Sequence, residues 1–373
     1  MKKGFYTLLV AQFFSALADN ALLFAAIALL AELNSPDWHT PLLQQFFVIS
    51  YILLAPFVGS IADAFPKGSV MFFSNSVKVV GCLAMIFGVP PLYAYGIVGI
   101  GAAAYSPAKY GILTEMLPSH LLVKANGWME GSTVTAIIAG LYITAAFFNY
   151  FIPKLPIEIK LESKSAFYML RDFWHAFITL WKDPLGQVSL AVTTLFWGAG
   201  ATLRLAVLAW AAIALNFNIE QSTQLIATVA IGIAVGSAVA SRYITLEEST
   251  KVLPAGIIMG LLVVLMALVS DWYIAALLLF LIGALSGFFV VPLNALLQHR
   301  GHHLIGAGHS IAVQNFNEHI GILIMLGFYL LMVKADVAIN AIIIVFGVFI
   351  IVSMSIINKL YRSKTVTETS MPI

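Results

Sequence analysis

The feature that most constrains this chain is a series of long segments that are almost free of charged side chains. Residues 272–297 and 337–358, for example, contain no Asp, Glu, Lys or Arg. A helix needs roughly 20 mostly apolar residues to cross the hydrocarbon layer of a bilayer, which is about 30 Å thick. The sequence therefore predicts an all-α polytopic membrane protein with eleven spans, at 5–31, 41–64, 69–89, 91–116, 129–152, 187–215, 222–243, 252–270, 272–297, 308–333 and 337–358.

The composition agrees with this class and excludes several others. Hydrophobic residues make up 61% of the 373 positions and charged residues 10%, against about 45–50% and about 25% in a soluble domain. The net charge is only +2, and no basic stripe interleaved with aromatic residues points to a nucleic-acid partner. A single cysteine, Cys82, excludes an intramolecular disulfide and a Cys-rich metal framework.

Motifs that would support an enzyme are absent from the sequence. There is no G-x-x-x-x-G-K-[ST] phosphate loop and no G-x-S-x-G nucleophile elbow, so neither ATP hydrolysis nor serine-type acyl transfer has a recognisable site. We therefore expect no enzyme activity, no catalytic residue and no cofactor.

The spans fall into two groups separated by a linker. We predict an N-terminal helical bundle over 1–152, a cytoplasmic linker over 153–186 and a C-terminal six-helix bundle over 187–373. Apolar side chains at alternating spacings of three and four residues predict an amphipathic helix at 165–184, with a face made of Phe167, Leu170, Trp174, Phe177 and Trp181. We expect this helix to lie at a membrane surface; a helix in a soluble insert is the alternative.

The distribution of Lys and Arg predicts the orientation. Cytoplasmic loops are enriched in these residues, and most of the 19 in this chain fall on one side if both termini and the linker are cytoplasmic. Five spans before the linker would deliver it to the opposite side. The charge pattern therefore indicates that one span is missing, and we place the deficit near 135–150.

Charged residues inside the spans are the first candidates for function. Each costs roughly 2.5–3.5 kcal/mol on insertion scales. Asp19, beside Asn20, lies in the first span, and Arg204 lies in the sixth. A polar cavity is the functional interpretation, in which Arg or Lys attracts a phosphate and a carboxylate attracts an amine. A structural ion pair that holds two helices in register is the alternative for Asp19. We assign no role to Lys78.

Other polar residues lie towards the ends of spans. Lys109, Glu130 and Glu318 belong to this group, and long side chains at such positions can also snorkel to the membrane surface. Pro107 precedes Lys109 in one half of the chain, much as Pro292 precedes Asn294 in the other. Weak internal symmetry of this kind is typical of transporters built from repeated bundles.

Four histidines cluster at a span boundary, at positions 299, 302, 303 and 309. No carboxylate or cysteine completes a recognisable ligand set. We therefore expect these side chains to belong to a solvated loop and expect no metal site.

The segment from residue 59 to 68 resembles the loop between the second and third helices of major facilitator superfamily transporters. In that superfamily a glycine packs the helices, an aspartate holds the loop and basic residues follow a glycine. The matching positions here are Gly59, Asp63, Lys67 and Gly68. This copy has Ala64 where an arginine is common.

Further blocks resemble the bacterial lysophospholipid transporters, a family within that superfamily. They lie at 18–24, 104–113, 123–127, 291–298 and 312–315, and the resemblance runs from about residue 5 to 360. It implies a twelve-span, two-bundle fold, one span more than we count. It also implies roles for Asp19, Lys109 and Arg204 in substrate passage and gating.

The resemblance carries a functional expectation. It implies flipping of lysophosphatidylethanolamine, and of lysophosphatidylglycerol, from the outer to the inner leaflet of the bacterial inner membrane, where an acyltransferase/acyl-ACP synthetase partner re-acylates them. We expect substrate-binding or gating roles for Asp19, Asn20, Lys109, Glu130, Arg204, Asn294, Gln314, Asn317 and Glu318.

Two alternatives stay open. The first is a proton-coupled exporter of drugs or small metabolites, in which Asp19 or Glu318 titrates. The second is a membrane scaffold that transports nothing and docks a lipid-remodelling enzyme through residues 165–184.

Overall fold

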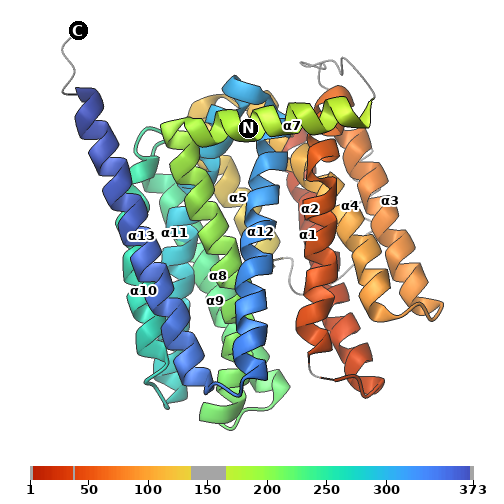
Figure 1. Ribbon diagram of the computed structural model, residues 1–373, viewed down its shortest axis with the longest axis vertical. Coiled ribbons are helices and arrows are strands. Elements are labelled where there is room, and N and C mark those ends of the chain that lie inside the picture. The colour runs from red at the N-terminus through yellow and green to blue at the C-terminus, as the bar shows by residue number, and fades with distance from the viewer. Residues whose placement is uncertain (1–2, 37, 136–164, 370–373) are drawn as a thin grey trace. The chain divides into compact units, whose positions relative to one another are not determined.

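The computed structural model describes residues 3–36, 38–135 and 165–369, and every regular element in these ranges is helical. Figure 1 shows their arrangement within the two parts of the chain. The helices are α1 (Lys3–Glu32), α2 (His39–Ala64), α3 (Lys67–Ile86), α4 (Pro91–Met116), η1 (Ser119–Leu121), α5 (Leu122–Thr135), α7 (Ala166–Lys182), α8 (Pro184–Ala214), α9 (Ile219–Tyr243), η3 (Ser249–Val252), α10 (Leu253–Met266), α11 (Trp272–Ile305), α12 (Ala307–Lys334) and α13 (Ile339–Thr369).

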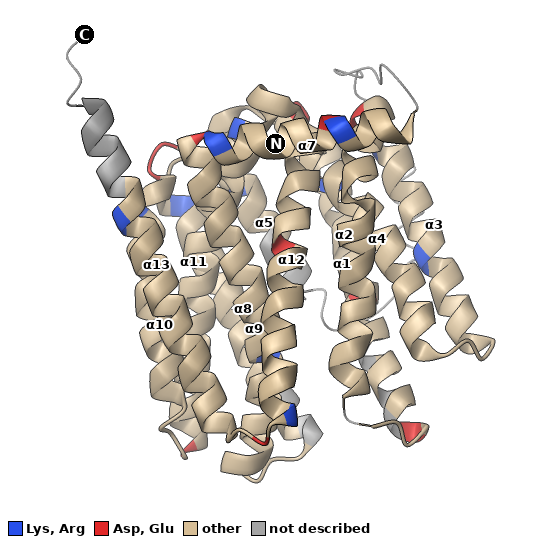
Figure 2. Cartoon of the chain, in the orientation of Figure 1, with Lys and Arg blue, Asp and Glu red and all other residues tan. Residues whose placement is uncertain are grey.

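Nine helical segments in the described ranges are long and apolar enough to cross a membrane. Figure 2 shows the long uncharged stretches that give them this character. Helix α4 is outside that group, although its bounds match the predicted span at 91–116. It is rich in Gly, Ala and Tyr and packs against both α2 and α3. The predicted deficit near 135–150 lies outside the described residues, and the number of spans stays a prediction.

The chain divides into two compact units. Unit 1 comprises Met1–Leu122, Ser132–Lys182 and Leu297–Leu323, and unit 2 comprises Val123–Gly131, Asp183–Leu296 and Ile324–Ile373. Helix α12 therefore begins in unit 1 and ends in unit 2. The predicted division of the chain at 153–186 follows the linker instead and stays a prediction.

Small residues set the helix contacts of unit 1. A Cβ atom at Gly99 would lie 2.8 Å from the carbonyl oxygen of Phe47, and one at Gly101 would lie 2.5 Å from that of Ser74. These contacts join α4 to α2 and α3. Lipid is as apolar as a leucine side chain, so membrane helices associate through such close packing rather than through a hydrophobic effect.

Unit 2 uses the same device between α9 and α11. A Cβ at Gly232 or Gly236 would overlap the backbone of α11, and a Cβ at Gly283 or Gly287 would overlap the backbone of α9. Both pairs have the G-x-x-x-G spacing that brings two helix backbones together in membranes. The tightest of these contacts is between Gly236 and the carbonyl oxygen of Ala284.

Local capping sequences determine where two helices of unit 2 begin. The Asp183 side chain accepts a hydrogen bond of 2.8 Å from the Gly186 amide, and Pro184 occupies the first helical turn of α8. Asn218 and Gln221 form a capping box at the start of α9. Each arrangement satisfies amides that a helix leaves without internal partners.

Helix α7 confirms the predicted helix in the linker, but a different face of it is buried. Phe173, Ala176 and Leu180 face the protein, whereas Phe167 of the predicted apolar face is 74% exposed and Trp174 is also exposed. Figure 1 shows α7 crossing the end of unit 1 where α2 ends and α12 begins. Phe167 and Trp174 therefore do not pack on the protein and are free to face lipid, as the predicted surface helix requires. Its location at a membrane surface stays a prediction.

Candidate functional site

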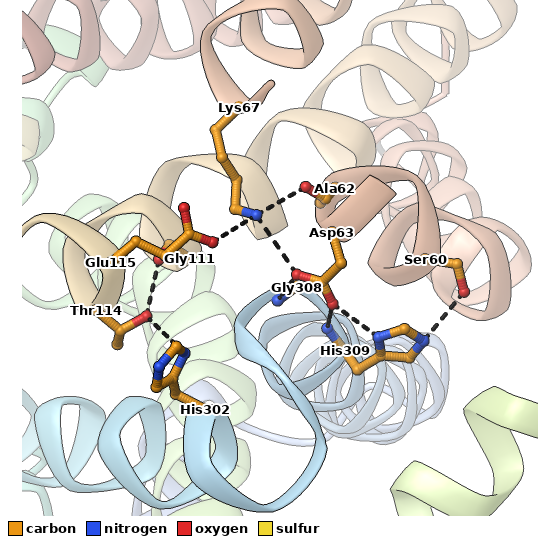
Figure 3. Close-up of polar contacts among 10 residues, drawn as sticks. All are labelled: Ser60, Ala62, Asp63, Lys67, Gly111, Thr114, Glu115, His302, Gly308 and His309. Carbon is orange, nitrogen blue, oxygen red and sulfur yellow. Dashed lines mark hydrogen bonds and ion pairs between the residues drawn. The ribbon is translucent and has the colours of Figure 1, made fainter. Parts of the chain in front are cut away.

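The first polar cluster surrounds Asp63, the aspartate of the loop motif, at the end of α2 (Figure 3). Its buried carboxylate accepts hydrogen bonds from the backbone amides of Gly308, at 2.6 Å, and His309, at 3.1 Å. The first amides of a helix have no partner within it, and the helix dipole favours a negative charge at this end. Asp63 therefore ties the end of α2 to the start of α12.

Lys67, the lysine of the motif, compensates the negative charge in this cluster. Its Nζ lies 2.7 Å from Glu115 Oε1, 2.8 Å from the carbonyl oxygen of Ala62 and 3.5 Å from Asp63 Oδ1 (Figure 3). The buried lysine joins the end of α2, the start of α3 and the end of α4.

Both motif glycines are buried, and Gly59 occupies a crowded position. A Cβ at Gly59 would lie 2.9 Å from Cβ of Ala312, so Gly59 lets α12 approach α2. Gly68 is buried in the first turn of α3. The motif therefore works as a packing and charge-pairing unit at one end of unit 1.

His309 corrects the prediction of a solvated histidine loop. The side chain is buried, with Nδ1 2.7 Å from Asp63 Oδ2 and Nε2 2.9 Å from Asp172 Oδ2. An ionised carboxylate can only accept hydrogen bonds, so a ring between two of them donates from both nitrogens as an imidazolium. Hydrogen bonding to His309, with its charge, lowers the pKa of Asp172 on α7.

The other three histidines of the group also depart from the predicted loop. His299, His302 and His303 belong to the last turns of α11. His302 Nδ1 lies 3.5 Å from Thr114 Oγ1 (Figure 3). In the described part of the chain, no group of three His, Cys, Asp or Glu side chains is placed to hold a metal ion.

A second polar cluster lies among the spans of unit 1 and centres on Asp19. Its carboxylate is 2.9 Å from Nζ of Lys78, which also donates to Ser15 Oγ at 3.1 Å. Ser15 in turn donates to Asn75 Oδ1 at 3.1 Å. The ammonium group of Lys78 also lies 4.7 Å from the centre of the Tyr105 ring. The ion pair proposed from sequence as the structural alternative for Asp19 is therefore present.

A third group is a row of buried polar side chains on α12, made of Gln314, Asn315, Asn317, Glu318 and His319. Gln314 donates to Glu318 at 2.7 Å, Ser106 donates to Asn315 at 3.2 Å, and Trp181 donates to Asn317 at 3.1 Å. The ring of His319 stacks on Tyr51, with centroids 3.6 Å apart. Unit 1 thus presents several buried, hydrogen-bonded polar side chains at spanning positions of α12.

Tyr51 links the second cluster to this row. It lies near the carboxylates of both Asp19 and Glu318. The structure therefore brings two of the predicted carboxylates to the same tyrosine, although 299 positions separate them in the sequence.

Of the remaining predicted residues, two have contacts within their own helix, two belong to unit 2, and one has a side chain outside the described part. Asn20 bonds to the carbonyl oxygen of Ala16 in its own helix at 2.8 Å, and Lys109 Nζ lies 3.9 Å from the centre of the Tyr110 ring. In unit 2, Arg204 is half-buried on α8 and Asn294 is buried on α11. Glu130 belongs to α5, and its side chain is outside the described part.

Sequence reasoning missed several participants. Lys78 and Glu115 carried a signal, since each is a charge within a predicted span, but nothing local indicated their partners. Asp172 and Tyr51 carried none. Each gains its role from a residue on another helix.

Comparison with known proteins places these features in a family. The family model of the Major Facilitator Superfamily matches residues 8–170. The chain is 46% identical to the "Lysophospholipid transporter LplT" of Yersinia enterocolitica over 363 residues, covering 91% of this chain and 90% of the relative. The protein of the same name from Yersinia pestis (strain Pestoides F) is also 46% identical, with 92% and 90% covered.

Solved structures show the same fold at low sequence identity. The human organic anion transporter MFSD10 aligns with a TM-score of 0.74 and 13% identity over 96% of this chain and 100% of that one. A bacterial homologue of the iron transporter ferroportin, in an outward-facing state, aligns with a TM-score of 0.72 and 14% identity over 97% and 100%. These matches support the two-bundle fold, and the relatives are transporters by name rather than enzymes. The chain therefore belongs to the lysophospholipid transporter family of the major facilitator superfamily.

Proposed function

We propose that this chain transports lysophospholipids, and that it moves lysophosphatidylethanolamine and lysophosphatidylglycerol from the outer to the inner leaflet of the bacterial inner membrane. The observation that carries the proposal is the 46% identity to curated lysophospholipid transporters over nine-tenths of the chain. The described helices support a multi-span membrane protein, as this activity requires.

The polar groups suit the chemistry of such a substrate. A lysophospholipid has one acyl chain, which needs an apolar wall, and a headgroup, which needs charged or hydrogen-bonding partners. Asp19 and Glu318 are carboxylates suited to the ammonium of ethanolamine, while Lys109 and Arg204 are cations suited to the phosphate. We propose headgroup contacts or gating for the remaining predicted residues, Asn20, Glu130, Asn294, Gln314 and Asn317.

The cluster around Asp63 supports a gating role for the loop motif. It ties α2 to α12 through bonds that require the start of α12 to stay in place. We propose that Gly59, Asp63, Lys67 and Gly68 stabilise one conformation of the transport cycle. Breaking buried charge pairs costs free energy. We therefore expect the loop motif to switch between a closed and an open state rather than to move gradually.

The setting of the protein follows from the same proposal. We propose that both termini are cytoplasmic, in line with the bias of Lys and Arg towards one side. An acyltransferase/acyl-ACP synthetase that re-acylates the delivered lysolipid is the proposed functional partner.

Purified protein in liposomes tests the function. Labelled lysophosphatidylethanolamine is added to one leaflet, and its appearance in the other is followed against protein-free liposomes. We expect movement well above the protein-free rate. Movement at the protein-free rate would contradict transport and favour the scaffold. Movement of other small molecules alone, abolished by an uncoupler, would favour the exporter.

Two variants test the proposed headgroup residues. Asp19→Asn and Arg204→Ala are expected to depress lysophosphatidylethanolamine uptake in spheroplasts without lowering expression. Glu248→Gln and Arg242→Ala are the matched controls, because the Arg242 side chain is exposed and that of Glu248 is 40% exposed. Uptake by Asp19→Asn and Arg204→Ala equal to that of these controls would remove both residues from the mechanism.

A further inference from the structure

Lys78 is a buried cation to which the proposed function assigns no role. It lies near the middle of α3, and its side chain is 1% exposed. Removing an ammonium group from water costs several kcal/mol, which only close and well-oriented partners repay. Because of this cost, we expect Lys78 to have a role other than packing.

The partners of Lys78 come from two other helices and hold it in place. Asp19 and Ser15 on α1 accept its hydrogen bonds, at 2.9 Å and 3.1 Å, and the Tyr105 ring on α4 lies 4.7 Å away. Packing restrains the aliphatic stem as well, because a Cβ at Gly101 would lie 2.7 Å from Cγ of Lys78. The lysine is therefore fixed along its whole length.

The two members of the ion pair are not equally buried. The Asp19 side chain is 29% exposed, whereas Lys78 is sealed from solvent. A ligand that reaches this pair meets the carboxylate and not the ammonium group. Asp19 and Glu318 both lie near Tyr51, so a second carboxylate lies in the neighbourhood.

We propose that Lys78 is a positioning residue that acts through Asp19, holding its carboxylate in the orientation that binds the ammonium of an ethanolamine headgroup. This inference rests on the proposed function and deepens it. It assigns the amine of the substrate to Asp19 and gives Lys78 no direct contact with the lipid. A substrate without an amine, such as lysophosphatidylglycerol, therefore depends little on Lys78.

A double-mutant cycle tests this dependence. The KM and kcat for lysophosphatidylethanolamine and for lysophosphatidylglycerol are measured in proteoliposomes for Lys78→Met, Asp19→Asn and the double variant. Each single change is expected to raise the KM for lysophosphatidylethanolamine about tenfold. This factor corresponds to the loss of one hydrogen bond to a charged group. The double variant is also expected to show about a tenfold rise, because Lys78 has nothing left to orient.

Additive effects, near a hundredfold in the double variant, would overturn the proposal, because Lys78 would then act independently of Asp19. An equal loss for both lipids in Lys78→Met would also overturn it, since a merely structural role makes no distinction between headgroups. Lys251→Met is the matched control. It removes a lysine from an ion pair of 2.6 Å that lies on the surface, and it should leave both KM values unchanged.

Two further points keep the test decisive. If Lys78→Met does not fold, Lys78→Gln retains a donor for Ser15, and the cycle is run with that variant. Wild-type protein that moves neither lipid would refute the proposed function itself. Wild-type protein that moves both lipids, combined with an additive cycle, would refute only the role of Lys78.

Discussion

The contact between Gly308 and Asp63 offers the sharpest test of how α12 is held in unit 1. A Cβ at Gly308 would lie 2.5 Å from Asp63 Oδ1 and 2.6 Å from the carbonyl oxygen of Gly59. Gly308→Ala must therefore displace either the start of α12 or the end of α2. The substitution adds one methyl group and changes no charge.

The size of the effect follows from these distances. Restoring an ordinary contact of 3.4 Å requires a shift of about 0.9 Å. A shift of that size would lengthen the 2.6 Å bond from the Gly308 amide to about 3.5 Å, beyond hydrogen-bonding range. A hydrogen bond to a charged group contributes about 1.5–3 kcal/mol, and alanine regains up to about 1 kcal/mol of helix propensity. We expect a net loss of about 0.5–3 kcal/mol.

Thermal unfolding in detergent measures this loss. For a unit of about 200 residues it corresponds to a Tm lowered by roughly 1–12 °C. Gly327→Ala is the matched control on the same helix, because nothing lies within 4 Å of a Cβ at that position. Equal melting temperatures for the two variants would refute the reasoning, since the Gly308 contact would then carry no energetic weight.

Three further predictions follow from the same structure. Gly236→Ala should lower the Tm clearly more than Gly200→Ala. A Cβ at position 236 would overlap the carbonyl oxygen of Ala284, whereas a Cβ at position 200 meets nothing within 4 Å. Equal melting temperatures would contradict the close contact of α9 and α11. Trp181→Phe should cost about 0.5–1.5 kcal/mol by removing the donor to Asn317, whereas Trp174→Phe, at an exposed position, should cost less in the same melts. The hydrogen bond from His309 lowers the pKa of Asp172. The stabilisation from this bond is therefore present above the ordinary aspartate pKa of about 3.9 and is lost as the pH falls through the lowered value. The Tm difference between wild type and Asp172→Asn should shrink from pH 7 towards pH 3, and a constant difference would count against the contact between His309 and Asp172.

The loop motif and the amphipathic helix show how far local patterns extend. Sequence comparison located Asp63 and Lys67 but not their partners, because Gly308 and Glu115 belong to other helices. The spacing of apolar residues predicted a helix at 165–184, and the structure has α7 over Ala166–Lys182. The structure adds a second apolar stripe, Phe173, Ala176 and Leu180, that packs on the protein, because periodicity counts apolar positions without telling which stripe contacts the protein.

What the sequence determined by itself was the class of protein, the extent of most described helices and the residues that resist burial in lipid. These properties are local, since hydrophobic length and backbone hydrogen bonding decide them segment by segment. Only the tertiary structure decided which charges meet. Lys78 reaches Asp19 across 59 positions, and His309 joins Asp63 to Asp172 from a third helix. An ion pair forms where helix packing brings two side chains within a few ångströms, and no pattern along one helix encodes that distance.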